Sequence, residues 1–476
     1  MKIAALPGID VRGLAYDSRQ VKPGDVFVAL KGLKAAGVDF AADAVRRGAI
    51  AVVADTPAGA ETSVPWIVVP DARAAMASLA AELYGHPSRS MQVVGITGTN
   101  GKTTTAYLLR AVFEAAGKKC GLLGTVAYSV GDEELPAART TPEAPDVQRM
   151  FRQMVDAGCR ACVMEVSSHA LALRRVDETA FAAAVFTNLT RDHLDYHGDM
   201  ESYFSAKRRL FDMLPPGAPS VINLDDPRGD SLRKVVSVPL TYAINKAADV
   251  TPGPLSLTFD GLEFDVRTPK GGVHVKSPLV GRPNVSNILA TVAVATALDV
   301  PSSAIELGLA NLGGVPGRFE LVSSATDDIG VVIDYAHTDD ALKNLLETAR
   351  PLARRRVITV FGCGGDRDRT KRPLMGAVAA RLSDVVVMTS DNPRTEDPIR
   401  IIEEIKRGVP PKTDRSADTF TILDRKEAIQ FAIKKAEPGD LVLLVGKGHE
   451  QSQVIGTTEL PFDEAAIARA ALERRR

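Results

Sequence analysis

Cysteine is scarce in this sequence, with only four among 476 residues. So few thiols exclude a small disulfide-stabilised scaffold and are consistent with a reducing cytoplasm. Cys159 and Cys162 form a Cys-x-x-Cys motif, which occurs in metal sites and in redox proteins. No second pair accompanies this motif, and Cys162 enters a predicted strand at 161–166. We therefore interpret both cysteines as buried small residues.

An excess of charge is also missing, because 58 basic and 59 acidic residues leave a net charge of -1. A balanced chain has no electrostatic footprint for nucleic acid or for an anionic membrane. The N-terminal apolar stretch is too short for a signal peptide, and no segment approaches a membrane span. We expect a cytoplasmic protein without nucleic-acid or membrane partners, in which any anion binds at a local site.

The length predicts about three domains. Hydrophobic residues make up 45% of the chain and charged residues 25%, as in ordinary globular proteins. Strands alternate with helices along most of the sequence, which is typical of α/β domains with parallel sheets. We place a small α/β domain at 1–88, a P-loop-type parallel-sheet domain at 89–316 and a Rossmann-like domain at 317–476. Alternating apolar positions predict an antiparallel excursion at 250–280.

The predicted strands of the third domain all end in polar loops. In the second domain we predict strands at 161–166, 183–189 and 220–224, and helices at 105–116, 144–157, 202–214 and 285–298. In the third we predict strands at 330–335, 356–363, 384–390 and 440–446. Ligands of open α/β sheets collect at the carboxyl ends of the strands, so four polar loops there predict a binding site.

Residues 98–104 predict a phosphate-binding loop between a β-branched run and a helix. The loop consists of Gly98, Thr99, Asn100, Gly101, Lys102, Thr103 and Thr104. Glycines let backbone N–H groups close on anionic oxygens, the helix start adds its positive dipole end, and Lys102 adds a point charge. The Thr103 hydroxyl stands where such loops hold Mg²⁺. Ile96 replaces the first glycine of the common loop, so this loop is shortened, unlike those of GTPases and motors.

Two further residues are candidate ligands for Mg²⁺ near the phosphates. Glu165 ends a predicted strand, and His193 follows another. With Thr103 they offer oxygen and imidazole ligands. Taken alone, Glu165 could equally pair with a buried cation, and His193 could be an ordinary loop residue.

The loops of the third domain have the charges that an amino acid requires. Arg394 follows Asp-Asn-Pro, and its planar guanidinium suits two-point contact with a carboxylate. Asp391 and Glu450 could hold ammonium groups. Further positive charge comes from Arg367, Arg369 and Arg372. The alternative interpretation is a surface network of salt bridges.

A phosphate loop combined with an amino-acid pocket indicates a particular chemistry. ATP would phosphorylate a carboxylate, turning a poor leaving oxygen into phosphate, and an amine would then attack. The residues alone do not identify the acid.

Several motifs resemble those of the cytoplasmic Mur ligases, which build the peptide of bacterial cell-wall precursors. They are residues 98–104, 164–171 (Met-Glu-Val-Ser-Ser-His-Ala-Leu), 192–198 (Asp-His-Leu-Asp-Tyr-His-Gly) and 334–337 (Asp-Tyr-Ala-His). The resemblance covers essentially the whole chain, and residues 16–27 are similar to the uridine-binding segment of the diaminopimelate-adding branch. It implies that ATP phosphorylates the D-glutamyl γ-carboxylate of UDP-MurNAc-L-Ala-D-Glu, and that an amine of meso-diaminopimelate attacks the acyl phosphate.

The resemblance also implies a role for each matching position. The UDP part would contact Tyr16, Ser18, Leu33, Lys34 and Ala35, and the muramyl peptide would contact Thr140, Thr141, Ser167 and Arg175. ATP would contact the loop at 98–104 together with Asn284, Arg318, Asp334 and His337. Diaminopimelate would contact Arg367, Asp391, Asn392, Pro393, Arg394, Gly446 and Glu450. The implied catalytic residues are Lys102, Glu165, His193 and Lys207.

Lys207 matches the carbamylated lysine of the family. An ammonium cannot ligate Mg²⁺, whereas its CO₂ adduct is an anionic oxygen ligand. The implied metal ligands are Thr103, Glu165, His193 and Lys207 as its carbamate (N6-carboxylysine). Without the resemblance, Lys207 would be interpreted as a solvated helix lysine.

Four positions depart from the usual pattern of the family. They are Arg139, Leu173, Pro283 and Asp339. Leu173 replaces a residue that is often glutamine, which removes one polar contact to the muramyl peptide. None of the four touches the phosphate chemistry, so we expect an active enzyme, and we expect it to be monomeric.

Competing functions differ in the features they need. The same reaction with lysine or ornithine would leave Arg394 without a distal carboxylate to bind. A folylpolyglutamate synthetase would lack the uridine-like N-terminal segment, and a non-catalytic ATP-binding partner of an amidation complex tends to have a cysteine-rich zinc insertion. A mechanical or switch NTPase is disfavoured by the shortened loop.

Overall fold

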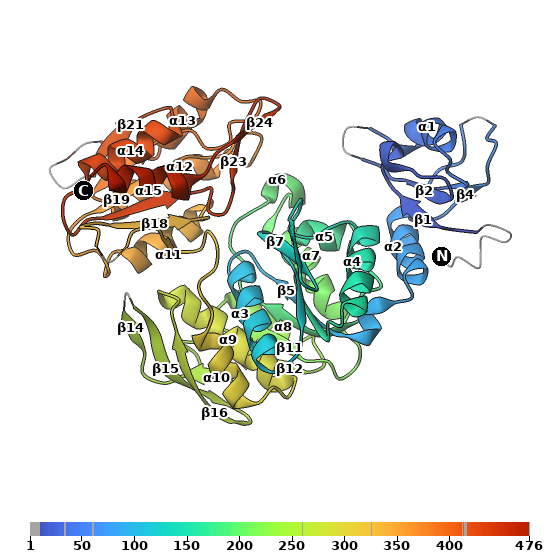
Figure 1. Ribbon diagram of the computed structural model, residues 1–476, viewed down its shortest axis with the longest axis horizontal. Helices are drawn as coiled ribbons and strands as arrows, with labels where there is room; N and C mark the ends of the chain where they lie inside the picture. Colours follow the sequence, from blue (N-terminus) through green and yellow to red (C-terminus); the bar gives the residue numbers. More distant parts are fainter. Residues whose placement is uncertain are drawn as a thin grey trace.

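Three α/β domains follow one another along the chain, from the N-terminal domain on the right of Figure 1 to the C-terminal domain on the left. The computed structural model describes residues 10–32, 35–59, 61–258, 260–324, 326–411, 413 and 417–475. The α/β class and the three-domain architecture predicted from the sequence are confirmed. Within the described residues, no helix combines the length and the apolar character needed to cross a membrane.

The N-terminal domain is a small parallel sheet with helices around it. Its strands, in spatial order, are β1 (Gly13–Ala15), β2 (Asp25–Ala29), β3 (Ala51–Ala54) and β4 (Trp66–Val68). Its helices are α1 (Ala41–Arg46) and α2 (Ala72–Leu83), with 3₁₀ turns η2 (Ser18–Gln20), η3 (Gly37–Phe40) and η4 (Pro87–Ser90). Strands β2 and β3 are buried along their whole length, as expected for parallel strands covered on both faces.

The central domain is built on an eight-stranded sheet. Its spatial order is β12 (Pro239–Tyr242), β11 (Ser220–Asn223), β10 (Phe181–Phe186), β5 (Gln92–Thr97), β9 (Ala161–Glu165), β6 (Cys120–Leu123), β7 (Ala127–Val130) and β8 (Glu133–Pro136). The first six strands run parallel, and β7 and β8 are antiparallel additions at one edge. Strand β5 therefore lies in the middle of the sheet, with β9 and β10 on its two sides.

Eight helices of the described chain belong to this domain. They are α3 (Lys102–Ala115), α4 (Ala144–Asp156), α5 (Ser168–Ala172), α6 (Leu194–His197), α7 (Met200–Asp212), α8 (Pro227–Arg233), α9 (Arg282–Ala297) and α10 (Ser302–Ala310). The core on one face contains residues of α3, α9 and α10, and the core on the other contains residues of α4 and α7.

The antiparallel excursion predicted at 250–280 is confirmed as a separate small sheet. It contains β13 (Thr251–Pro252), β14 (Ser256–Thr258), β15 (Gly261–Thr268) and β16 (Gly271–Ser277), at the lower left of Figure 1. The inward side chains of β15 and β16 alternate with exposed ones and join the core of α3, α9 and α10.

The C-terminal domain has a six-stranded sheet and a separate hairpin. The sheet order is β17 (Glu320–Leu321), β18 (Gly330–Asp334), β22 (Leu441–Val445), β19 (Val357–Phe361), β20 (Val385–Met388) and β21 (Asp418–Thr421). Its helices are α11 (Asp339–Ala349), α12 (Lys371–Leu382), α13 (Pro398–Lys406), α14 (Arg425–Lys435) and α15 (Glu464–Glu473). The hairpin pairs β23 (Ser452–Ile455) with β24 (Thr458–Pro461) and stands at the edge of the domain in Figure 1.

The predicted strands and helices of the last two domains are all present, with shifted ends. All four predicted strands of the C-terminal domain are shorter in the structure, because the residues at their ends belong to the loops. Strand β10 begins at Phe181, two residues before the predicted start. Helix α3 begins at Lys102 and not at residue 105, so the lysine and two threonines of the predicted loop form its first turn.

Candidate functional site

The predicted phosphate loop connects β5 to α3 and can be built only with glycine at two positions. Gly98 has φ +149° and Gly101 has φ +86°, values that favour glycine. A Cβ on Gly98 would lie 1.9 Å from Thr187 Oγ1, and a Cβ on Gly101 would lie 2.4 Å from Asn287 Oδ1. The loop is therefore packed tightly between its neighbours while its backbone N–H groups lead into the start of α3.

Side chains of the loop fix it to the surrounding structure. Lys102 Nζ donates to the carbonyls of Gly98 (3.0 Å) and Thr99 (2.9 Å), and burial lowers the pKa of its ammonium. Thr99 Oγ1 donates to the Thr190 carbonyl at 3.1 Å. Asn100 Nδ2 donates to Asp340 of the C-terminal domain at 3.0 Å. The loop thus contacts a second domain directly.

Glu165 lies beside the loop, as the sequence predicted, because β9 pairs with β5 and places Glu165 opposite Ile96. Thr103 Oγ1 donates to Glu165 Oε2 at 3.0 Å. Thr125 adds two bonds, from its N–H to Oε1 (2.8 Å) and from its hydroxyl to Oε2 (3.0 Å). Sequence reasoning missed Thr125, although a hydroxyl just beyond the end of β6 fits the rule that ligands gather at strand ends.

Lys207 is buried in α7, contrary to the solvated helix lysine that its local sequence alone suggests. Its Nζ donates to the Gly98 carbonyl at 2.8 Å and lies 4.4 Å from the centre of the Tyr203 ring. Neither group carries a full negative charge. Burial and then the nearby Lys102 hold the pKa of Lys207 well below its usual value, which favours the neutral amine.

His193 lies in a cluster of aromatic rings rather than against Glu165. Its ring is 4.7 Å from that of His169, and its Nε2 lies 3.3 Å from Asp192 Oδ2. Burial lowers the pKa of His193 to about 3, so the imidazole is neutral near pH 7. Among the described residues, no three His, Cys, Asp or Glu side chains are gathered closely enough to hold a metal. Of the predicted Mg²⁺ ligands, only Glu165 and His193 are of these residue types. The other two are the Thr103 hydroxyl and the Lys207 carbamate.

The residues predicted for the muramyl peptide form a continuous line from Glu165. Thr140 Oγ1 lies 3.1 Å from Thr125 Oγ1. Thr141 Oγ1 donates to the Glu165 carbonyl at 2.8 Å and lies 3.2 Å from Ser167 Oγ. Arg175 continues the line by donating to the Thr141 carbonyl at 3.1 Å. The structure brings all four predicted residues together next to the phosphate loop.

Beyond Arg175, one buried carboxylate is surrounded by three guanidinium groups. Glu143 is 2.9 Å from Arg175, 2.8 Å from Arg139 and 3.3 Å from Arg73 at the start of α2. One negative charge faces three positive charges, so this cluster has a local excess of positive charge. Arg139 is thus held by Glu143, and Arg73 was not predicted because no nearby residue in the sequence indicated this contact.

The residues predicted for the UDP part lie in the N-terminal domain. Tyr16 donates to Asp146 of α4 at 2.7 Å, and burial raises the pKa of its hydroxyl. Ser18 is buried, and the Ala35 carbonyl accepts from the N–H of Gly32 at 3.0 Å. Leu33 and Lys34 lie outside the described residues. Tyr16 therefore connects this domain to the central one.

Residues from the start of the C-terminal domain close over the phosphate loop. Arg318 donates to Thr103 Oγ1 at 3.2 Å, and its guanidinium stacks 4.5 Å from the centre of the Tyr335 ring. Asp334 accepts from the N–H groups of Phe319 and Ala336, both at 2.8 Å.

The two remaining residues predicted for ATP lie on either side of the contact between the phosphate loop and the C-terminal domain. His337 is 3.0 Å from the Tyr335 carbonyl, and burial lowers the pKa of its imidazole to about 4. Asn284 lies on α9, where it accepts from Asn287, the side chain that packs against Gly101. Asn284 is thus connected to Gly101 through Asn287, and His337 is connected to Arg318 through Tyr335.

The residues predicted for the amino-acid pocket lie at the carboxyl ends of β19, β20 and β22. Arg394 donates to the Gly365 carbonyl at 2.9 Å, and Arg367 donates to the Asp366 carbonyl at 3.0 Å. Gly446 has φ +115°, and a Cβ there would lie 2.6 Å from Asp391 Oδ2. The pocket residues therefore come from three strand ends, as the sequence predicted.

Both polar atoms of the Asn392 side-chain amide have hydrogen-bond partners. Its Oδ1 accepts from Lys447 Nζ and from the N–H of Val454, both at 3.0 Å. Its Nδ2 donates to Glu450 Oε2 at 2.8 Å. Pro393, which follows, is buried. Asn392 thus connects two of the predicted pocket loops to each other.

Three cations with fully buried side chains stand behind the pocket. Arg372 pairs with Glu396 and Glu404, Arg425 pairs with Glu464 at 2.7 Å, and Lys447 lies 3.3 Å from Glu450. Arg369 also pairs with Glu404. Arg369 and Arg372 are therefore held in ion pairs, although Arg372 is buried and not on the surface as the salt-bridge alternative had it. Sequence reasoning missed Arg425 and Lys447.

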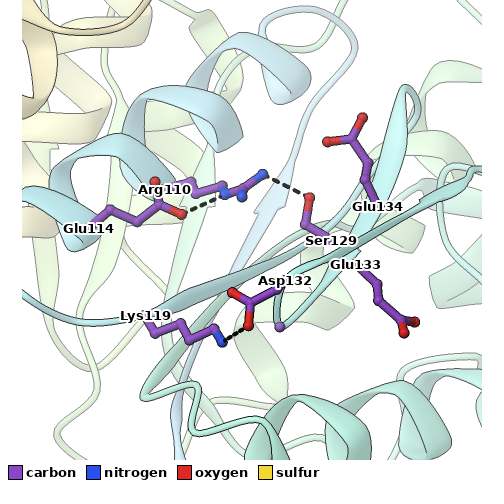
Figure 2. A pocket seen from close by; sticks show the side chains of 8 residues that line it. Arg110, Glu114, Lys119, Ser129, Asp132, Glu133 and Glu134 are labelled. Carbon is purple, nitrogen blue, oxygen red and sulfur yellow. Dashed lines mark hydrogen bonds and ion pairs between the residues drawn. The ribbon is translucent and has the colours of Figure 1, made fainter.

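A cavity of about 430 Å³ lies away from these residues, between α3 and the β7–β8 edge (Figure 2). It is lined by Arg110, Glu114, Lys119, Ser129, Gly131, Asp132, Glu133 and Glu134. Its cations already have partners, because Arg110 donates to Glu114 and Ser129, and Lys119 donates to Asp132 (Figure 2). It contains none of the predicted site residues.

Family models match all three domains. The model described as Mur ligase family, catalytic domain, matches residues 10–84. The Mur ligase middle domain matches residues 96–295, and the Mur ligase, glutamate ligase domain, matches residues 317–448.

Similar proteins cover nearly the whole chain. A UDP-N-acetylmuramoyl-L-alanyl-D-glutamate–2,6-diaminopimelate ligase of Gloeobacter violaceus is 48% identical over 472 residues, which span 99% of this chain and 96% of that protein. The ligase of the same name from Geobacillus thermodenitrificans is 47% identical over 476 residues, or 98% of this chain and 96% of that protein.

Solved structures have the same fold. The structure of a ligase with this name superimposes with a TM-score of 0.69 at 34% identity and covers 98% of this chain and 95% of its own. A MurF ligase from Thermotoga maritima in complex with ADP has a TM-score of 0.66 at 20% identity and covers 98% of this chain and all of its own.

Proposed function

The chain belongs to the Mur ligase family, and we propose that it joins meso-2,6-diaminopimelate to the D-glutamyl γ-carboxylate of UDP-MurNAc-L-Ala-D-Glu, with cleavage of ATP to ADP and phosphate. Relatives that are 43–48% identical over nearly the whole chain are named as ligases for these two substrates. The product would be a precursor of peptidoglycan. We take the working enzyme to be a cytoplasmic monomer.

The hydrogen-bonded line from the phosphate loop to Arg175 is the observation that carries this proposal. Thr103 contacts Glu165, Thr141 donates to the Glu165 carbonyl, and Arg175 donates to the Thr141 carbonyl. A nucleotide held at the loop and an acceptor held along this line would therefore be neighbours. Direct transfer of a phosphoryl group to a carboxylate requires such proximity.

The proposed reaction has two steps, phosphoryl transfer and amide formation. A γ-carboxylate oxygen of the acceptor attacks the γ-phosphorus of ATP, the bond to the β-phosphate oxygen breaks, and ADP leaves. An amine nitrogen of diaminopimelate attacks the acyl carbon, phosphate departs, and the nitrogen loses a proton as the amide forms. Lys102 and the backbone N–H groups of the loop would stabilise the charge on the transferred group.

The residues next to the loop fit a Mg²⁺ site. Thr103 and Glu165 offer hard oxygen ligands within contact of each other, and His193 is neutral. Burial lowers the pKa of Lys207, which shifts it toward the neutral amine, the form that combines with CO₂ to give a carbamate. We propose these four as the ligands, with Lys207 carbamylated. When bound, Mg²⁺ would neutralise charge on the phosphate oxygens.

Arg394 would select diaminopimelate by pairing with the distal carboxylate that lysine and ornithine lack. Asp391 and Glu450 would hold the ammonium group, and Arg367 adds positive charge at the rim of the pocket. A site built to pair a charged group rejects analogues without that group strongly. The pocket and the phosphate loop lie on different domains, so we propose that the domains close for the amine to reach the acyl phosphate.

Phosphate release tests the proposal directly. The purified protein is incubated with ATP and Mg²⁺, with and without UDP-MurNAc-L-Ala-D-Glu, and with diaminopimelate, lysine or ornithine in turn. We expect phosphate only when the nucleotide dipeptide and diaminopimelate are both present. Equal rates with lysine would disprove the role of Arg394, and release without the nucleotide dipeptide would disprove the proposed acceptor.

A further inference from the structure

The hairpin formed by β23 and β24 is attached to the pocket loop at residues 391–394. Gln453 Nε2 donates to the Asp391 carbonyl at 2.6 Å, and the N–H of Val454 donates to Asn392 Oδ1 at 3.0 Å. The N–H of Arg394 donates to the Val454 carbonyl at 3.1 Å, and the N–H of Gly456 donates to the Arg394 carbonyl at 2.7 Å. One edge of the hairpin thus bonds to three of the four loop residues.

The hairpin contributes little to the folding core. All of β24 is exposed, and Ile455 and Leu460 are exposed apolar side chains. Among the described residues, none between 452 and 461 belongs to the hydrophobic clusters of the C-terminal domain. Apart from the chain segments on either side of it, the hairpin is therefore connected to its domain mainly by the hydrogen bonds to the pocket loop.

These bonds hold Arg394 in an unusual backbone conformation. Arg394 has φ +52°, in the left-handed region that side chains other than glycine rarely adopt. Both its N–H and its carbonyl are occupied by the hairpin, and its side chain reaches the Gly365 carbonyl on the opposite side. A backbone held on both sides of such a residue fixes the direction in which the guanidinium points.

We propose that this hairpin sets the selectivity of the amino-acid pocket, with Gln453 as a positioning residue that aims Asp391 and Arg394 at the two ends of the bound amino acid. The inference rests on the proposed function for the identity of the ligand. Gln453 is suited to this role because it is the only side chain of the β23 strand in the described chain that donates to the backbone of the pocket loop. It acts through Asp391 and Arg394 and needs no contact with substrate.

The test compares Gln453→Leu, which keeps volume but removes the donor, with Ser452→Ala as a matched control. Ser452 lies on the same strand, but its hydroxyl bonds to the exposed Glu459 within the hairpin at 2.5 Å. We expect Gln453→Leu to raise the KM for diaminopimelate roughly three- to tenfold, the size of one lost hydrogen bond. The KM values for ATP and for the nucleotide dipeptide should change less than twofold, and the preference for diaminopimelate over lysine should fall in proportion.

Each other outcome overturns the inference. A parallel rise in all three KM values would indicate general damage to the fold, and an unchanged KM for diaminopimelate would show that the hairpin does not aim the loop. An equal effect of Ser452→Ala would show that the hairpin matters only through its own stability.

A second measurement needs no substrate and so separates this inference from the proposed function. Hydrogen exchange of the backbone N–H groups is followed by mass spectrometry in peptides that cover 391–396 and 452–457. We expect Gln453→Leu to accelerate exchange in both peptides, while the peptides of the phosphate loop keep the rates of the unsubstituted protein. Unchanged exchange at 391–396 would overturn the inference, even if diaminopimelate proved not to be the substrate.

Discussion

The phosphate loop and the amino-acid pocket both lie at strand ends of parallel sheets, but they are held in different ways. Around residues 98–104 the contacts are glycine packing, lysine bonds to the Gly98 carbonyl, and hydrogen bonds of Thr103 and Thr125 with Glu165. Around residues 391–394 the contacts come from buried cations, from Asn392 and from a hairpin. The first arrangement presents backbone groups, and the second fixes charged side chains.

The difference suits the groups that we propose for the two sites. A phosphate group is bound well by any ring of N–H groups with one positive charge, so a tightly packed backbone is sufficient. An amino acid with charges at both ends is recognised only if opposite charges stand at the correct separation. Fixing that separation requires rigid supports behind Asp391 and Arg394, and buried ion pairs provide them at a cost in desolvation.

Removal of Lys102 should have the largest effect, and it should impair the phosphate loop without affecting the amino-acid pocket. We expect Lys102→Ala to lower kcat/KM for ADP formation roughly a thousandfold, because it removes the charge that stabilises the transferred group. Direct binding of diaminopimelate, measured by calorimetry, should be unchanged. Lys118→Ala is the control, since Lys118 lies just after α3 and donates to Gln92. A weaker loss than tenfold would disprove the role assigned to Lys102.

Arg394→Ala should impair the amino-acid pocket without affecting the phosphate loop. We expect the KM for diaminopimelate to rise by about a hundredfold, as a charge-assisted two-point contact is lost. Lysine kinetics and acyl-phosphate formation should remain as they are in the unsubstituted protein. Arg400→Ala on α13 is the matched control, because that side chain is 84% exposed. Unchanged diaminopimelate kinetics in Arg394→Ala would overturn the assignment of the pocket.

Glu404→Gln tests whether buried ion pairs support the pocket domain. Hydrogen bonds from Arg369, and then from Arg372, lower the pKa of Glu404 to about 2. We expect a loss of about 2 kcal/mol in unfolding free energy at pH 7, because Arg372 is left buried with Glu396 alone. Urea denaturation followed by circular dichroism measures it, with the exposed Glu403→Gln as control.

The pH dependence of this effect has a definite sign. Glu404 has a folded pKa below its ordinary value, so it contributes its full stabilisation above pH 4.5, and this is lost as the pH falls toward 2. The gap between the unsubstituted protein and Glu404→Gln should therefore narrow over that range. A gap that stays constant would show that the ion pair does not cause the destabilisation.

The smallest effect is expected from a substitution at the contact between the central and C-terminal domains. Arg191 bonds to Asp339 at 3.1 Å and to Thr370 at 2.8 Å, so it joins the central domain to the C-terminal domain. Because the pair is partly exposed, we expect Arg191→Ala to change kcat less than about threefold, and less still at high salt. A larger change in kcat would mean that this contact controls the closing of the domains.

Much of the phosphate region could be predicted because its signals are local. The strand before Gly98, the two glycines and the lysine are consecutive, so the loop and the nearby Glu165 followed from the order of elements. The start of α3 was missed because Thr103 and Thr104 carry no apolar periodicity. The burial of Lys207 depends on how α7 packs against the loop, which no local pattern of α7 reveals.

The supports of the amino-acid pocket could not be predicted in the same way. Arg372 meets Glu396 and Glu404, which lie 24 and 32 residues away in the sequence, so charge pattern alone left open whether it binds a ligand. The hairpin gave no signal because its strands are short and its side chains are mostly exposed. What the sequence does show is the polar residues at the strand ends, and those lie where predicted.

The burial of all four native cysteines makes this protein convenient for fluorescence. Cys120, Cys159, Cys162 and Cys363 are buried and unpaired, and burial raises the pKa of each thiol. A thiol introduced by Thr457→Cys in the exposed hairpin turn would therefore react with a maleimide dye far ahead of the native ones. Paired with a second dye on the N-terminal domain, it would report in real time whether the outer domains move when each substrate is added.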